Sequence, residues 1–307
     1  MVSLVTSVFG TLLLSLVATP CAVPPDTTSS YSGGDTSGCG KTHVGQAIGL
    51  PIYRDIKSSG LRRSYSVHLP SDYDKGRRYP AILGFHGSGS VGLFFEVDTK
   101  LDEARFTRDK VMVYPNGLGG AWAGANYSKA TVAQDLQFVW DLLADLRRNF
   151  CIDSARIYAT GLSIGGGFVD TIACNSSVGG EFAAMAPASG SFYTDNEDNH
   201  HLCQPARVPM PILEFHGGAD ADVKYGGGQG EGGTEPAIPS WYVRQLAQIK
   251  AISSADSWWQ TVKVGLVGSP ERMRHAPSSR GPVCRRRPSS KLDVPGTGGS
   301  GAALQDR

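Results

Sequence analysis

The chain is 307 residues long, and its charges nearly balance, with 29 Lys and Arg against 28 Asp and Glu. The core of the chain carries no basic stripe and no acidic tail, which argues against nucleic acid as a partner. Once the terminal segments are set aside, the remaining length suits one α/β domain better than two.

The first residues predict a secretory signal peptide over Met1 to Ala22. An apolar run from Leu4 to Val17 is followed by small residues and Pro20, although no Lys or Arg precedes it. A transmembrane anchor is the alternative, but the run is too short to span a bilayer comfortably. The mature chain is therefore expected to be secreted and soluble, with a flexible leader up to Gly38 that is rich in Pro, Ser, Thr and Gly.

Cysteines and glycosylation motifs agree with an extracellular protein. Cys21 falls in the signal, and four cysteines remain in the body: Cys39, Cys151, Cys174 and Cys203. An even number in an oxidising compartment predicts two disulfides, and the sequence leaves all three pairings open. Asn126-Tyr127-Ser128 and Asn175-Ser176-Ser177 are N-glycosylation acceptors.

Short apolar strands alternate with a helical pattern along the body. The strands are expected at 63–69, 81–85, 111–114, 155–160, 182–186 and 210–215. Thr131 is expected to cap a helix, because Val132, Leu136, Val139, Leu143 and Leu146 recur at spacings of four and three. This alternation predicts a mostly parallel sheet with helices on both faces.

The most informative motif is G-x-S-x-G at Gly161, Ser163 and Gly165. It follows the strand at 155–160 directly and leads into a helical run, which is the order of a nucleophile elbow. At such a turn the serine hydroxyl projects from the sheet edge, and the first amides of the helix point at the same place. The motif therefore predicts that Ser163 is a catalytic nucleophile.

A serine nucleophile needs an acid, a base and an oxyanion hole. Asp220 follows the strand at 210–215 and is the predicted triad acid, with Asp222 left open as the alternative. The oxyanion amides are predicted at Ile164 and at Ser88, in the loop after the strand at 81–85. Two histidines at strand ends, His86 and His216, are expected to bond nearby backbone rather than to act as bases.

Five segments together resemble the secreted fungal feruloyl esterases, a group related to acetyl xylan esterases and polyhydroxybutyrate depolymerases. They are F-H-G at 85–87, V-Y-P-N-G-L at 113–118, R-I-Y-A-T-G-L-S-I-G-G-G-F at 156–168, A-P-A-S-G-S-F-Y at 186–193 and P-I-L-E-F-H-G-G-A-D at 211–220. The resemblance covers about Gly38 to Trp241. It implies an α/β-hydrolase fold with Ser163 as nucleophile, Asp220 as triad acid and Trp122 in the substrate pocket. In the family Lys and Asn usually flank the serine, whereas Leu162 and Ile164 flank it here.

The resemblance stops after Trp241, and with it the expected position of the triad histidine. The family carries this histidine in a G-H-x-W-P type loop near the C-terminus, and the sequence has no such motif. His275 is the only later histidine, and no strand precedes it. From Pro270 the tail is dominated by Arg, Pro, Gly and Ser, as out-of-frame reading of GC-rich coding sequence often is. We therefore expect a retained intron and a frame change beyond Trp241, so that the C-terminal part of the fold is incomplete.

The resulting expectation is a signal peptide at 1–22, a leader at 23–38, an α/β-hydrolase esterase domain at 39–250 and an aberrant or disordered tail at 251–307. The resemblance implies a serine esterase that cleaves feruloyl esters of plant cell-wall arabinoxylan, without metal or organic cofactor. A monomer without nucleic-acid or membrane partners is expected. Acetyl xylan esterase activity and a non-catalytic descendant of the fold are the alternatives, and the missing histidine favours the second.

Overall fold

The computed structural model describes residues 37–43, 50–194, 203, 205–206 and 210–242. All of them belong to the first of two units, Met1–Leu266, and the second unit, Val267–Arg307, lies outside the described residues. The predicted signal peptide, most of the leader, the tail and His275 also lie outside them. None of the described helices is long and apolar enough to cross a membrane.

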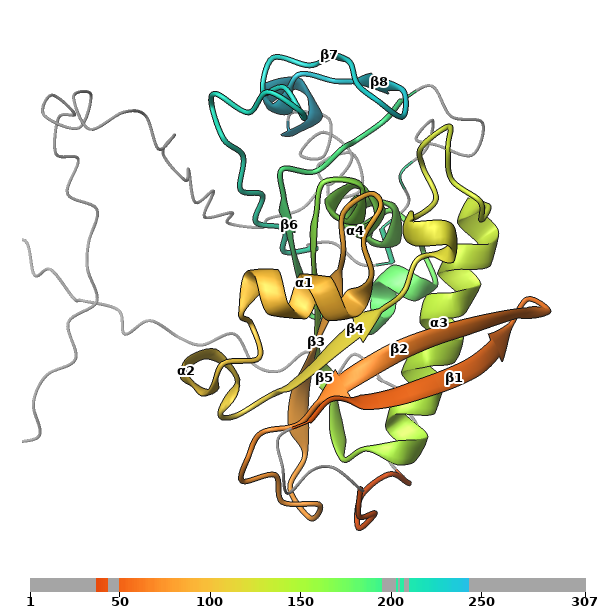
Figure 1. Cartoon of the computed structure of the whole chain (residues 1–307), viewed down its shortest axis with the longest axis vertical. Helices are drawn as coiled ribbons and strands as arrows, with labels where there is room; N and C mark the ends of the chain where they lie inside the picture. Colours follow the sequence, from red (N-terminus) through yellow and green to blue (C-terminus); the bar gives the residue numbers. More distant parts are fainter. Residues whose placement is uncertain (1–36, 44–49, 195–202, 204, 207–209, 243–307) are drawn as a thin grey trace, which may run out of the picture. The chain divides into compact units, whose positions relative to one another are not determined.

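A six-stranded sheet forms the centre of the described part (Figure 1), with the strand order β1-β2-β4-β3-β5-β6. The strands are β1 (Ile52–Ser58), β2 (Leu61–His68), β3 (Tyr79–Phe85), β4 (Val111–Pro115), β5 (Ile152–Leu162) and β6 (Ala184–Ala188). The strands β3, β4, β5 and β6 run parallel, whereas β1 and β2 are antiparallel to each other and β2 is antiparallel to β4. The predicted mostly parallel sheet is therefore confirmed.

Helices cover both faces of this sheet. Alternate strand residues point to opposite sides, and apolar residues on each side pack against helices. On one face, Leu83 and Val113 belong to a large apolar core that also contains residues of α3 (Val132–Asn149) and α4 (Ile164–Ala173). On the other face, Met112 and Tyr114 pack with Phe95 of α1 (Gly92–Thr99). The remaining elements are short: α2 (Ala104–Thr107), the 3-10 helices η2 (Leu118–Gly120) and η3 (Val178–Glu181), and the hairpin of β7 (Gly228–Gln229) and β8 (Thr234–Glu235).

The helix predicted after Thr131 is confirmed as α3, which begins in a capping box. The Thr131 side chain accepts a hydrogen bond from the amide of Gln134, and the Gln134 side chain accepts one from the amide of Thr131. These two bonds satisfy amides that a helix N-terminus would otherwise leave without partners. Leu136, Val139, Leu143 and Leu146 all face the core, as their spacing predicts.

Two predicted strands differ from the structure. The strand predicted at 182–186 begins two residues later, as β6. The segment at 210–215 is not a continuous strand, but it pairs in parallel with β6 through bridges from Ile212 to Met185 and from Phe215 to Ala188. Backbone hydrogen bonds join 211–215 to β6 and Ser189, so the predicted position is confirmed. Its physical position explains the break in continuity, because it lies at the outer edge beside β6, where Leu213 and Phe215 are 38% and 48% exposed. The strand β1 and the helix α1 were not predicted.

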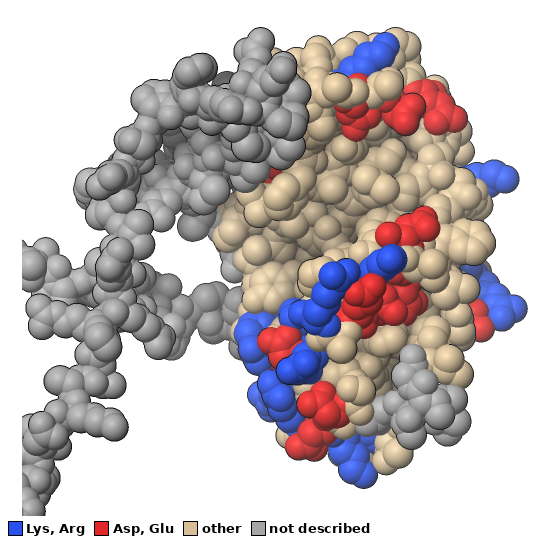
Figure 2. Space-filling model, turned by 60° about the vertical axis from the view of Figure 1, so that its left-hand side comes forward, with Lys and Arg blue, Asp and Glu red and all other residues tan. Residues whose placement is uncertain are grey.

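Charged side chains of both signs are seen near the top and in the lower half of Figure 2, and a broad region between them carries few charges. Large exposed apolar side chains of the described part include Val91, Leu93, Phe94 and Val97, in and just before α1.

Two disulfides form, as predicted, and the structure resolves their pairing: Cys39 with Cys151 and Cys174 with Cys203. The first joins the start of the described chain to the residue before β5, and the second ties the end of α4 to Cys203. Disulfides stabilise mainly by restricting the unfolded chain, so the bond that closes the longer loop contributes more.

Reduction is therefore expected to destabilise the protein by about 2 to 5 kcal/mol per bond. The two bonds span 112 and 29 residues, so removing Cys39–Cys151 should cost about 1 kcal/mol more than removing Cys174–Cys203. Denaturant unfolding of the two paired Cys→Ser variants measures this difference. Four alkylatable thiols at these positions in the unreduced protein would contradict the pairing.

Candidate active site

The G-x-S-x-G motif forms the sharp turn that its pattern predicts. Ser163 lies between β5 and α4, with φ 56° and ψ −123°. A non-glycine residue rarely adopts such a positive φ, and residues held there cluster at functional sites. Ser163 is half-buried, whereas Ile164, the first residue of α4, is buried.

The glycines of the motif allow the neighbouring backbones to approach the turn closely. A Cβ atom on Gly165 would lie 2.2 Å from the carbonyl oxygen of Phe85, at the end of β3. A Cβ on Gly167 would lie 2.1 Å from the carbonyl oxygen of Ser191. No side chain fits at either position without moving this backbone, so the run of small residues after Ser163 is required by packing.

Backbone hydrogen bonds fix the serine to the segment that follows β6. The amide of Ser163 donates to the carbonyl of Ala188 over 3.1 Å, and the amide of Ser191 donates to the carbonyl of Ser163 over 3.0 Å. The amide of Gly167 donates to the same carbonyl, within the first turn of α4. The strained conformation of Ser163 is thus held from two sides.

Asp220 lies on the same side of the sheet as this segment and is well suited to remain ionised. Its Oδ1 accepts hydrogen bonds from the amides of Asp222 and Val223, at 3.1 and 3.0 Å. Partial burial raises the pKa of Asp220, but hydrogen bonds from Ser189 and from these two amides lower it more, so the pKa lies below its usual value. Asp222, the alternative, is exposed.

Ser189 connects the serine turn to Asp220. It follows Ala188, the acceptor for Ser163, and its own amide donates to the carbonyl of Phe215 over 2.7 Å. Ser189 also has a positive φ, 42°, and its side chain bonds Asp220. Ala188 and Ser189 thus link the Ser163 turn to Asp220: Ala188 accepts from the Ser163 amide, and the Ser189 side chain bonds Asp220.

The loop predicted to supply an oxyanion amide lies against the serine. A Cβ on Gly87 would lie 3.7 Å from both the Cβ of Ser163 and the carbonyl oxygen of Leu162. Ser88, the next residue, is exposed. The amide of Gly89 donates to the carbonyl of Gly120 over 2.9 Å, which fixes the far side of the loop. The loop therefore packs against the Ser163 turn at Gly87, the residue before Ser88.

Asn116 also positions this loop, and the sequence analysis did not single it out. Its Oδ1 accepts a hydrogen bond from the amide of Gly92, the first residue of α1, and its Nδ2 donates to Ser64. The sequence does contain a signal for this residue, because Asn116 directly follows β4 in the Y-P-N-G motif. Polar residues at the carboxyl ends of parallel strands commonly belong to functional sites.

The structure corrects the prediction for Trp122. Its side chain is completely buried between Phe138 and Phe168, with ring centroids 6.4 and 5.2 Å away. The indole Nε1 donates to the carbonyl of His86 over 3.1 Å. Trp122 therefore holds the loop at 86–88 through its hydrogen bond to His86. Its ring has no exposed surface for a substrate, because it is stacked between two aromatic rings of the core.

His86 and His216 bond nearby backbone, as predicted. The Nε2 of His86 accepts from the amide of Gly117, and its Nδ1 lies 2.7 Å from the carbonyl of Gly87, while burial lowers the pKa of His86. The Nε2 of His216 lies 2.7 Å from the carbonyl of Val223, and its Nδ1 lies 2.8 Å from Glu214. Burial lowers the pKa of His216, but the hydrogen bonds to Glu214 and Val223 raise it more.

The described residues do not bring a histidine to the serine. Their four histidines are His43, His68, His86 and His216, and none of them forms a hydrogen bond with the Ser163 hydroxyl.

A surface hollow of about 600 Å³ is lined by residues of α3 and by Asn175, Ser177 and Val178. Because it includes no residue of the serine turn, we assign it no part in the site.

Comparison with known proteins finds esterases among the proteins that this chain resembles. No family model matches the chain. The sequence is 26% identical over 226 residues to probable feruloyl esterase C of Aspergillus niger, covering 68% of this chain and 73% of that protein. It is 29% identical over 171 residues to feruloyl esterase B of Piromyces equi, covering 54% of this chain and 31% of that protein. An acetyl xylan esterase structure from Aspergillus awamori aligns with a TM-score of 0.47 at 14% identity, over 65% of this chain and 80% of that one. The resemblance seen in the motifs is thus confirmed by sequence comparison: the chain is similar to fungal feruloyl esterases, and its mostly parallel sheet with helices on both faces is an α/β fold.

Proposed function

We propose that the protein is a secreted serine carboxylesterase that hydrolyses feruloyl esters of plant cell-wall xylan. The observation that carries the proposal is the strained turn at Ser163, with φ 56°, between β5 and α4. The similarity to feruloyl esterases supports the reaction and the substrate class. Two disulfides support an extracellular location.

The proposed reaction is an acyl transfer in two steps. Ser163 attacks the ester carbonyl, and the amides of Ile164 and Ser88 stabilise the negative charge that develops on the carbonyl oxygen. The general base takes the Ser163 proton and passes it to the sugar oxygen as the ester C–O bond breaks, so the sugar leaves as an alcohol and a feruloyl ester of Ser163 remains. Water then attacks this ester and releases ferulic acid.

In the proposed mechanism Asp220 orients the general base. Its carboxylate stays ionised above its lowered pKa, and it stabilises a positively charged imidazole during the reaction. Among the described histidines, His86 and His216 have other partners, so the proposal takes neither as the general base. Without a general base, only the oxyanion amides and substrate binding accelerate the reaction, by about 10³- to 10⁴-fold over water.

A substrate comparison on the full chain tests the proposal. We expect methyl ferulate to be hydrolysed with a higher kcat/KM than an acetate ester of xylose. A preference for the acetate ester would assign the protein to acetyl xylan esterases instead. Absence of turnover on both esters, in a folded protein, would identify a non-catalytic member of the fold.

A further inference from the structure

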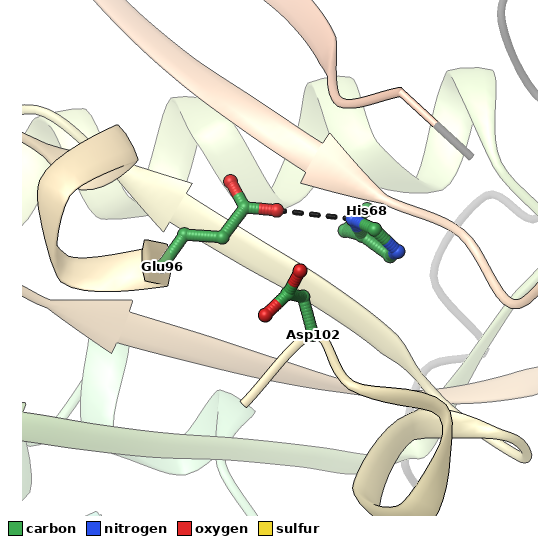
Figure 3. A group of neighbouring side chains, drawn as sticks. All are labelled: His68, Glu96 and Asp102. Atoms are coloured by element: carbon green, nitrogen blue, oxygen red, sulfur yellow. Dashed lines mark hydrogen bonds and ion pairs between the residues drawn. The ribbon is translucent and has the colours of Figure 1, made fainter. Parts of the chain in front are cut away.

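Three side chains with metal-binding atoms meet on the face of the sheet that α1 covers (Figure 3). His68 ends β2, Glu96 belongs to α1, and Asp102 follows α1 in the chain. One ligand atom from each lies within 4.8 Å of the other two, and the Nδ1 of His68 lies 3.0 Å from Oε1 of Glu96. None of the three takes part in the site around Ser163.

Burial makes this cluster unusual. Glu96 is 4% exposed, and its Oε2 has no hydrogen-bond partner among the described residues. A buried carboxylate oxygen without a partner is costly, so it is normally paired or bound to a metal. His68 and Asp102 are only half-buried, which leaves an approach for an ion from solvent.

A second buried polar group lies on the same face of the sheet, in the cluster that packs against α1. Tyr114, on β4, is completely buried, and its hydroxyl also has no partner among the described residues. Tyr114 packs with Phe95 of α1 and Met112 of β4, so this hydroxyl is a second buried polar atom between α1 and the sheet.

We propose that His68, Glu96 and Asp102 bind a zinc ion, which would also give the buried Oε2 of Glu96 a partner. One imidazole nitrogen with carboxylate oxygens is a donor set of zinc, whereas calcium and magnesium prefer oxygen alone. Zinc bonds of about 2.0–2.2 Å place tetrahedral ligand atoms about 3.3 Å apart. The observed separations, 3.0 Å and up to 4.8 Å, bracket this value, so small side-chain rotations suffice.

Such an ion would join α1 to the sheet. His68 pairs with Met112 of β4, and Phe95, beside Glu96, packs on Met112 and Tyr114. At its other end α1 begins at Gly92, close after the loop that contains Ser88. The zinc site is therefore structural, and its occupancy stabilises the element that follows the oxyanion loop.

Calorimetric titration of the chelator-treated full chain with zinc chloride tests the proposal. We expect one site that fits at micromolar affinity or tighter, with a rise in Tm that grows with zinc concentration. His68→Gln and Asp102→Asn should each weaken binding at least about tenfold. Asp98→Asn removes an exposed carboxylate of α1 and should leave the affinity unchanged.

Cobalt substitution provides a readout that does not depend on folding of the variants. Cobalt(II) in the wild-type protein should give the visible absorption of a tetrahedral nitrogen and oxygen site, and zinc should displace it. Absence of binding, or equal affinity of wild type, His68→Gln and Asp102→Asn, would overturn the proposal. These readouts do not involve ester hydrolysis, so they stand apart from the proposed function.

Discussion

Replacing Ser163 by Ala is expected to lower kcat on a feruloyl ester by about a million-fold in a form of the protein that carries a working base. The hydroxyl forms the covalent bond to the acyl group, and no other group in the turn replaces it. The backbone hydrogen bonds to Ala188 and Ser191 do not involve the side chain, so the fold should persist. Steady-state hydrolysis of methyl ferulate, with circular dichroism of both proteins, measures the two effects.

Ser71→Ala serves as the matched control, because Ser71 is an exposed turn residue outside the site. It should retain full activity. A fluorophosphonate probe should label Ser163 in the wild type and nothing in Ser163→Ala. Substantial turnover by Ser163→Ala, or labelling of a different serine, would show that the nucleophile lies elsewhere.

The parts of the site that sequence analysis predicted are those that local physics determines. The positive φ at Ser163 and the close backbone contacts at Gly165 require small residues at fixed spacing, so the motif can be recognised from the sequence alone. The capping box at Thr131 is equally local. Asp220 was predicted because the carboxyl ends of parallel strands collect functional groups at one edge.

The parts that were missed depend on contacts between distant segments. The cluster of His68, Glu96 and Asp102 forms because α1 packs across β4 and next to β2, and the spacing of these residues in the sequence does not predict it. Trp122 was expected in a pocket, but the aromatic rings of Phe138 and Phe168 bury it. The pairing of four cysteines likewise required the fold.

A buried ion pair on the core face predicts the largest effect on stability. The Nη1 of Arg63 lies 2.7 Å from Oδ1 of Asp135, and both side chains are almost fully buried. The guanidinium also lies 4.0 Å from the centre of the Phe138 ring. Arg63→Met leaves the Asp135 carboxylate without its counter-charge, so we expect a loss of about 3 to 5 kcal/mol in the free energy of unfolding.

The loss should shrink in acid. Burial already raises the pKa of Asp135, against the opposing effect of Arg63, and removal of Arg63 raises it further. A carboxyl group whose pKa is raised in the folded state binds its proton more tightly there, so stability falls as pH rises from the unfolded pKa to the folded one. The deficit of Arg63→Met is therefore complete above the folded pKa and recovers as pH falls towards about 4, the pKa of an unfolded Asp.

Two variants separate the charge effect from lost packing. In Arg63→Met/Asp135→Asn the buried charge is gone, while the Asn oxygen can still accept the hydrogen bond that Asp135 receives from the amide of Ala123. We expect this double variant to be more stable than Arg63→Met at neutral pH. Arg62→Met removes an exposed partner of Asp55 and should leave the unfolding midpoint unchanged, because solvent screens that pair. Denaturant titrations between pH 4 and 8 provide the comparison, and a loss in Arg63→Met that is independent of pH and equal in the double variant would assign the cost to packing alone.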